Sequence, residues 1–345
     1  MVGAMRARHR ELGRGERVLP GLWRLRLPLP WPGVPHGNAW AIAAGDGLVL
    51  VDTGIHSEDS MAQLERAMDQ VGLSIEQVRL LVITHAHTDH WGQAKPIVER
   101  AGCEMWIHPA HRRALAHLAD READLRLRLE VGRQSGVPKA ALDEYAEVYA
   151  GHPPPFAGAV AAARDLVDGV VVDTDLGPWE VYETPGHAPS HVCLYQAEHR
   201  LLISGDHLLG RTVLWFEYGD SADPIAEYIA SLDVVAGLRA RLALSGHGKP
   251  FLDVPGHIES SRRALRAQLD NALAALADGP RTATEITPRV LGSDRAGANP
   301  TWLLPLTLCV LEHLEREGRV TRHPDGVVER WRLTGPDNLD TTVSR

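Results

Sequence analysis

Short apolar runs separated by turn residues dominate the first part of the chain. Residues 38–43 and 48–51 flank an Ala-Gly-Asp-Gly turn, which is typical of a β-hairpin. Residues 80–84 form a continuous apolar run, as expected for a strand buried on both faces. Apolar residues between these runs recur at helical spacing, at Met61, Leu64, Met68 and Val71. The alternation predicts an α/β domain over residues 17–257, preceded by a flexible N-terminal arm at residues 1–16.

Two later segments depart from this alternation. Residues 109–157 place leucines among Arg, Asp and Glu, which indicates amphipathic helices inserted into the domain. We expect two helices there, the second starting at Val137-Pro138 and ending at the prolines 153–155. After residue 257 the pattern predicts three helices and one β-hairpin. This order of elements predicts a winged-helix-like C-terminal domain at residues 258–345.

Composition narrows the class of protein. Of 345 residues, 44% are hydrophobic and 23% are charged, which is ordinary for a folded globular chain. No apolar run reaches the roughly 20 residues of a membrane-spanning helix, and the first residues lack the apolar segment of a signal peptide. We therefore expect a cytoplasmic protein without a membrane partner. The three cysteines lie far apart without a Cys-x-x-Cys motif, which argues against a disulfide framework or a thiolate metal site.

Charge argues against a nucleic-acid partner. The formal net charge is −9, and residues 258–345 contain 12 arginines and 12 acidic residues. A nucleic-acid-binding module normally carries an excess of basic residues, so the C-terminal region lacks that signature.

Histidines gather where predicted strands end. Residues 84–90 read Thr-His-Ala-His-Thr-Asp-His, and residues 184–187, 204–207 and 245–248 each join an apolar run to a polar loop with a histidine. Functional groups of α/β folds collect on such loops, and the neighbouring glycines permit the tight turns that aim these side chains inward. Imidazole and carboxylate ligands suit Zn²⁺, although Mn²⁺ or iron could use the same set.

The histidine-rich loop is hard to explain without a metal. A lone buried histidine is most simply a core residue with its hydrogen bonds satisfied. Burying His85, His87, Asp89 and His90 together would cost several kcal/mol of desolvation with nothing to offset it. The loop therefore predicts a metal site.

With these motifs the sequence resembles the metallo-β-lactamase-fold hydrolases, the superfamily that includes hydroxyacylglutathione hydrolase. The resemblance covers about residues 17–257, where five separate signatures occur in the same order. It implies an α/β fold, a four-layer αββα sandwich with two divalent metal ions in the cleft between the sheets. The C-terminal region resembles the small winged-helix domain of the lactamase-β-like protein-2 group.

The resemblance also implies a role for each matching residue. The first ion would be bound by His85, His87 and His187, and the second by Asp89, His90 and His247. Asp206 would bridge both ions, and Asp52 would support the metal loop from the end of its strand. Two further histidines have open roles: His191 is either a hydrogen-bond donor to the site or a core residue, and His207 is either near the cleft or structural.

The implied activity is hydrolysis of a thioester, ester or lactone carbonyl by a metal-bridging hydroxide, with Asp89 orienting the nucleophile or accepting its proton. The best-known zinc β-lactamases have a cysteine where Asp206 stands, so a true β-lactamase is not expected. The alternatives are a phosphodiesterase or ribonuclease of the same fold, and a metal-bearing nucleic-acid-binding protein. The neutral C-terminal region weakens both.

The expected partner is a small-molecule acyl substrate. Six aromatic residues are candidates for the cleft or, equally, for the core: Trp31, Trp40, Trp91, Trp215, Phe216 and Tyr218. The helical insertion is either a lid over the cleft or a contact in a homodimer.

Overall fold

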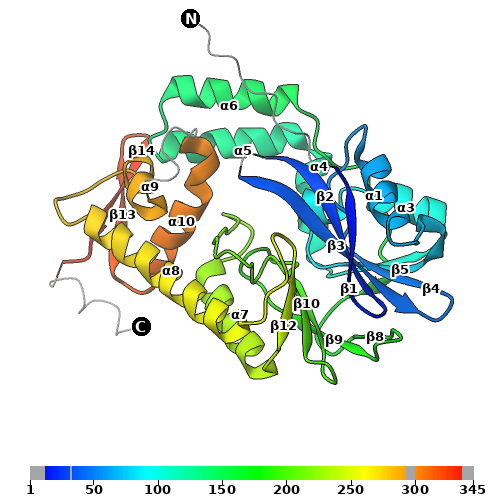
Figure 1. Cartoon of the computed structure of the whole chain (residues 1–345). Coiled ribbons are helices and arrows are strands. Elements are labelled where there is room, and N and C mark those ends of the chain that lie inside the picture. The colour runs from blue at the N-terminus through cyan, green and yellow to red at the C-terminus, as the bar shows by residue number, and fades with distance from the viewer. Residues whose placement is uncertain (1–11, 32, 293–299, 336–345) are drawn as a thin grey trace, which may run out of the picture.

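Two β-sheets lie face to face, and helices cover their outer sides (Figure 1). The computed structural model describes residues 12–31, 33–292 and 300–335. The first sheet has the strand order of the chain: β1 (Arg14–Leu19), β2 (Leu22–Trp31), β3 (Val34–Ala44), β4 (Gly47–Val51), β5 (Val78–Ile83), β6 (Glu104–Ile107) and β7 (Arg164–Asp165). The second runs in the order β12 (Leu242–Ser245), β11 (Leu201–Gly205), β10 (Val192–Gln196), β9 (Trp179–Glu183) and β8 (Val171–Val172). The predicted αββα arrangement is confirmed.

Strand β1 corrects the expected N-terminal arm. It begins at Arg14 and pairs antiparallel with β2, so residues 14–16 belong to the sheet. Long-range contacts also hold this segment, because the backbone N–H of Gly13 and that of Gly15 donate to the side chains of Gln63 and Gln70. Residues 1–11 lie outside the described part of the chain.

The space between the sheets is filled by apolar side chains from both. Trp40 and Val82 of the first sheet and Trp179, Val192 and Leu244 of the second are completely buried there. On the outer side of the first sheet lie α1 (Ser60–Asp69) and α3 (Ala94–Ala101). Because both faces are covered, the part of β5 after Arg79 reads as a continuous apolar run, which is the signal that predicted this strand.

The helical insertion contains three helices rather than the two expected. They are α4 (His111–Ala119), α5 (Arg121–Gln134) and α6 (Lys139–Gly151). The break falls at Asp120, whose non-helical backbone ends α4 and whose side chain accepts a hydrogen bond from the backbone N–H of Ala123 at the start of α5. A single aspartate therefore acts as the N-cap of α5, and the spacing of apolar residues alone does not reveal the helix break at this position.

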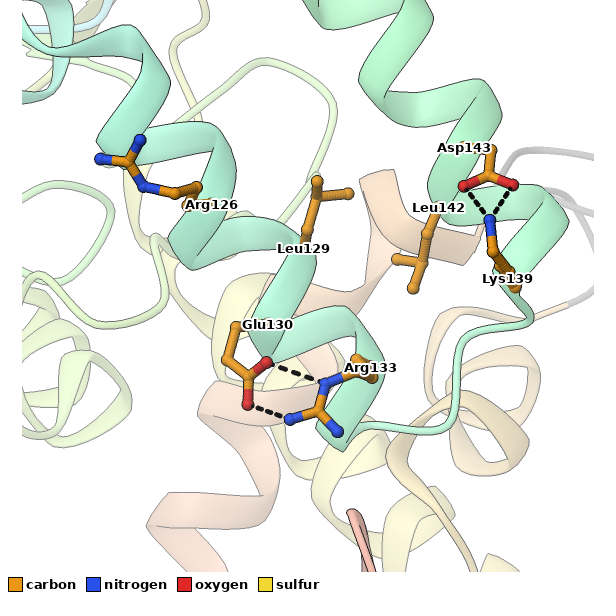
Figure 2. A pocket seen from close by; sticks show the side chains of 7 residues that line it. All are labelled: Arg126, Leu129, Glu130, Arg133, Lys139, Leu142 and Asp143. Atoms are coloured by element: carbon orange, nitrogen blue, oxygen red, sulfur yellow. Dashed lines mark hydrogen bonds and ion pairs between the residues drawn. The ribbon is translucent and has the colours of Figure 1, made fainter.

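Helices α5 and α6 run side by side along one edge of the molecule (Figure 1). Figure 2 shows the shallow pocket between them, with Leu129 and Leu142 projecting into it. The basic side chains that line the pocket form ion pairs with nearby carboxylates: Arg126 with Glu122, Arg133 with Glu130 and Lys139 with Asp143. The pocket contains none of the predicted site residues.

The C-terminal elements are α8 (Val254–Ala275), α9 (Ala283–Leu291), α10 (Pro300–Arg316) and the hairpin of β13 (Val320–Asp325) and β14 (Val328–Leu333). Three helices and one hairpin are thus present as predicted; their assignment as a winged-helix domain stays a prediction. Helix α8 begins at Val254, so the expected domain boundary after residue 257 falls inside a helix.

These elements share one hydrophobic core with the second sheet. Leu265 of α8 and Leu311 of α10 belong to the same buried cluster as Leu202 of β11 and Leu232 of α7 (Pro224–Leu238). The insertion also reaches them, because the backbone N–H of Thr284 donates to the carbonyl of Ser135. The C-terminal elements are therefore continuous with the sandwich.

This shared core predicts a single unfolding transition. Leu311→Ala removes a completely buried side chain and should lower the free energy of unfolding by about 3 kcal/mol. Circular dichroism and tryptophan fluorescence should report the same shifted midpoint in urea. The control is Leu127→Ala, whose side chain is 56% exposed on α5 and whose replacement should change stability by less than about 0.5 kcal/mol. An early transition confined to the C-terminal helices would contradict the prediction.

Candidate metal centre

The seven predicted ligands all follow strands of the two sheets. His85, His87, Asp89 and His90 follow β5, His187 follows β9, Asp206 follows β11 and His247 follows β12. The strand pairs β4–β5 and β11–β12 are parallel, so their carboxyl ends lie at the same edge of each sheet. The two edges are joined directly, because the backbone N–H of Asn38 in β3 donates to the carbonyl of Gly246. Residues distant in sequence thus meet at one point.

Three imidazoles form the first donor group. Nδ1 of His87 lies 3.1 Å from Nε2 of His85 and 3.0 Å from Nε2 of His187. These three residues are close enough to bind one ion together. They are the set that the resemblance assigns to the first ion.

A second donor group lies beside the first. Oδ2 of Asp89 is 3.1 Å from Nε2 of His247 and 3.5 Å from Nε2 of His90. Asp89, His90 and His247 are again close enough for one ion, and they are the set expected for the second.

Asp206 lies between the two groups. Its Oδ2 atom is 3.2 Å from Nε2 of His247 and 3.8 Å from Nε2 of His187, so it faces one histidine of each group. Its Oδ1 atom is 3.5 Å from Nε2 of His90. Neither Asp206 Oδ1 nor His90 Nε2 has a hydrogen-bond partner among the described residues, although both atoms are buried. Such unpaired buried donors and acceptors are costly, and a cation between them would satisfy both. The residues therefore fit a pair of divalent ions.

Burial and charge set the protonation of these groups. Burial lowers the pKa of His85 well below its usual value and that of His187 to about 4, so both rings are neutral. Burial raises the pKa of Asp206, but His247 and His90 lower it further, which keeps the carboxylate ionised. Burial lowers the pKa of His247, yet Asp206 and Asp89 raise it to about 10. Without an ion His247 holds a proton, and a bound cation would displace it.

Asp52 contacts the histidine-rich loop through both of its carboxylate oxygens. Its Oδ2 atom is 2.8 Å from Nδ1 of His90, and Oδ1 accepts from the backbone N–H of Thr84. Asp52 has a positive φ of 63°, which turns the chain sharply at the end of β4. Such an acceptor behind a ligating histidine fixes the orientation of the ring and the nitrogen that carries its proton.

Two other histidines are held in the same way by backbone carbonyl oxygens. Nδ1 of His187 lies 3.0 Å from the carbonyl oxygen of Trp215, and Nδ1 of His247 lies 3.0 Å from that of His36. In each case Nδ1–H donates to the carbonyl, which leaves Nε2 directed at the site.

Glycine at 246 leaves room for the carboxylate of Asp206. A Cβ atom at this position would collide with Asp206 Oδ1 and approach His90 Cε1 to 2.6 Å. Any larger residue would displace the groups that converge here.

His191 supports the site without belonging to a donor group. Its buried Nε2 atom accepts from the backbone N–H of Asp206 and that of His207, at 3.1 and 3.2 Å. Its Nδ1 atom lies 2.8 Å from Oγ1 of Thr184. The ring therefore fixes the turn that presents Asp206, which agrees with the first of its two expected roles except that Nε2 acts as acceptor.

His207 lies on the far side of that turn. Its ring is buried 4.9 Å from the ring of Tyr228 in α7, and burial lowers its pKa to about 3. It belongs to none of the donor groups, which favours the structural interpretation.

The aromatic candidates for the cleft differ in how far they are buried. Trp40, Trp91 and Phe216 are buried in the core, and Tyr218 is tied to Glu312 of α10. Trp31 is 41% exposed at the end of β2.

Sequence reasoning missed Glu217, whose Oε1 atom lies 3.5 Å from Nε2 of His87. Burial raises its pKa, but His87 and Arg128 lower it to about 2. A single glutamate in a loop without a recognisable motif gave no signal.

Comparisons with known proteins agree with this geometry. A crystal structure of a metallo-beta-lactamase family protein from Thermus thermophilus superposes with a TM-score of 0.76 and 28% identity, covering 92% of this chain and 100% of that one. The probable metallo-hydrolase YqjP of Bacillus subtilis (strain 168) is 25% identical over 259 residues, 71% of this chain and 77% of that protein. Thioesterase pkgB of Emericella nidulans is 26% identical over 242 residues, 69% of this chain and 54% of that protein.

The family assignment rests on a longer match. The model of the metallo-beta-lactamase superfamily matches residues 32–247, from the β2–β3 hairpin to the last of the predicted ligands. This chain belongs to the metallo-beta-lactamase superfamily.

Proposed function

We propose that the chain is a dinuclear metal-dependent hydrolase of acyl thioesters, with esters and lactones as related substrates. The observation that carries the proposal is the position of Asp206, which faces histidines of both donor groups. A carboxylate has two oxygens and one negative charge, so it can serve two cations at once. Two independent sites would not need to share it.

The donor set supports zinc, with manganese or iron as alternatives. Five imidazoles and two carboxylates exceed what one tetrahedral or five-coordinate ion can use. Divalent ions bound here would supply a water that ionises near neutral pH and a Lewis acid for the carbonyl oxygen.

The chain's own residues would hold the reacting groups in place. Asp52 and His191 fix His90 and the Asp206 turn, so the donors are arranged before substrate arrives. Asp89 would orient the attacking water through its carboxylate or accept the proton it loses.

Thioesters are proposed as the preferred substrates because one of the similar proteins is named a thioesterase. Thioesterase pkgB matches 69% of this chain. A thioester releases a thiol, which is a better leaving group than an alcohol. The substrate is expected to be a small acyl compound, and a homodimer and a cytoplasmic location stay predictions. Among the described helices, none is both long and apolar enough to cross a membrane.

Turnover against a panel of substrates tests the reaction class. Acyl-thioesters should be cleaved fastest, simple esters and lactones more slowly, and a β-lactam and bis(p-nitrophenyl) phosphate at background rates. Release of thiol or acid is followed with the metal-loaded protein. Preference for the phosphodiester would instead support the phosphodiesterase alternative.

The purified protein should contain close to two transition-metal ions per chain, mostly zinc. Elemental analysis measures this directly. Chelation should lower the melting temperature, because ions that bind only the folded state stabilise it. A protein with native circular dichroism and no metal would contradict the proposal.

Asp206→Asn should lower turnover by a factor of about 100 or more. The amide keeps the shape of the side chain but removes the negative charge that would face both ions, so one ion should bind much more weakly. Metal content and turnover are measured together. The matched control is Asp233→Asn, because Asp233 lies on the surface of α7 with its side chain 70% exposed. A variant at 206 with two ions and a normal rate would exclude the shared-carboxylate arrangement.

A further inference from the structure

Glu217 lies beside the first donor group, in the loop between β11 and α7. Its Oε1 atom is 3.5 Å from Nε2 of His87, while Nδ1 of the same ring faces His85 and His187. Nε2 of His87 is buried and has no hydrogen-bond partner among the described residues. The ring thus directs one nitrogen at the donor group and the other at a carboxylate.

We propose that Glu217 is a positioning residue for the metal centre and acts through His87. The inference rests on the proposed metal centre. A neutral imidazole carries its proton on one nitrogen only, so an acceptor at Nε2 keeps the proton there and leaves the lone pair of Nδ1 for an ion. Oε1 of Glu217 lies 3.5 Å from Nε2 of His87, so this carboxylate is placed to be that acceptor. Glu217 thereby does for His87 what Asp52 does for His90.

The same loop orients a second ligand of the first group. The carbonyl oxygen of Trp215, two residues before Glu217, accepts from Nδ1 of His187 at 3.0 Å. Two of the three histidines in this group are therefore aligned by one short segment, residues 215–217. The position of this segment decides where both rings point.

The insertion holds this loop from one side. Nη2 of Arg113 in α4 donates to the carbonyl of Gly219 at 2.7 Å, and its Nε atom lies 3.0 Å from Oδ1 of Asp220. His117, one turn further along α4, has Nε2 3.2 Å from the same Asp220 oxygen. The insertion therefore contacts the metal centre indirectly, through the loop that carries Glu217.

Helix α10 also holds the loop. The hydroxyl of Tyr218 donates to Oε1 of Glu312 at 3.1 Å, and the thiol of Cys309 donates to the carbonyl of Glu217 at 3.6 Å. The two α10 residues thus contact Glu217 and the residue that follows it. The carboxylate is thus carried on a segment fixed by two separate helices, which suits a group whose task is to hold a ring in one orientation.

Metal affinity of the full-length protein tests the proposal. Competition between the protein and a chromophoric chelator for Co²⁺ gives the affinity of each ion without reference to turnover. Glu217→Ala should weaken one of the two ions by roughly 10- to 100-fold and leave the other nearly unchanged. Glu217→Gln should give a smaller loss, because its amide oxygen accepts from Nε2–H without the negative charge.

A double-mutant cycle separates positioning from a structural effect. If Glu217 acts through His87, adding Glu217→Ala to a His87→Ala variant causes no further loss of Co²⁺ affinity. Glu122→Gln is the control: it removes the charge of a carboxylate whose side chain is 84% exposed on α5, away from this loop, and should leave both affinities unchanged. Circular dichroism of the metal-free variants checks that each one folds.

The outcomes distinguish this inference from the proposed function. A wild-type protein that binds no Co²⁺ would overturn the metal centre itself. A wild-type protein that binds two ions, with the same affinities in Glu217→Ala, would overturn only the role of Glu217. Equal losses from Glu217→Ala with and without His87 would overturn it as well, since the effect would then not pass through that ring.

Discussion

The structure is organised around the cost of crowding five imidazoles and two carboxylates into one buried site. Atoms such as Asp206 Oδ1 and His90 Nε2 are removed from water without a partner among the described residues, and an unpaired buried polar group costs about 1–3 kcal/mol. Cations bound in the site would satisfy these groups together. The surrounding fold must therefore hold each donor rigidly, because the arrangement is stable only when all of them converge.

The two-sheet scaffold meets this requirement by using strand ends. Parallel pairing places Asp52 next to the β5 loop in one sheet and Asp206 next to His247 in the other. Strands anchored in the interior core have little freedom at their ends, so the short loops that follow them inherit that rigidity. The acceptors behind the rings, such as Asp52 and the carbonyls of Trp215 and His36, then fix the last degree of freedom, the ring rotation.

The difference between donors placed at strand ends and acceptors placed behind them explains what could be predicted from the sequence. The candidate ligands could be named because four of them occur within six residues and the others follow recognisable apolar strands. Glu217 was not found, because its contact with His87 depends on how a long loop is folded against two helices. The break at Asp120 was missed for a similar reason: one side-chain cap outweighs an uninterrupted amphipathic pattern. Local patterns identify ligands and strands, whereas the contacts behind the ligands and the helix breaks depend on tertiary packing or single hydrogen bonds.

The loop between β11 and α7 links the remaining parts of the chain to the site. A loop of this length loses substantial conformational entropy when it is ordered, and its own backbone makes few regular hydrogen bonds to offset that loss. Contacts from Arg113 of α4 and Glu312 of α10 supply the compensation. The insertion and the C-terminal helices therefore stabilise the same segment, although they are far apart in sequence. Because that segment aligns His87 and His187, the geometry of the first donor group depends on elements that contribute no ligand of their own.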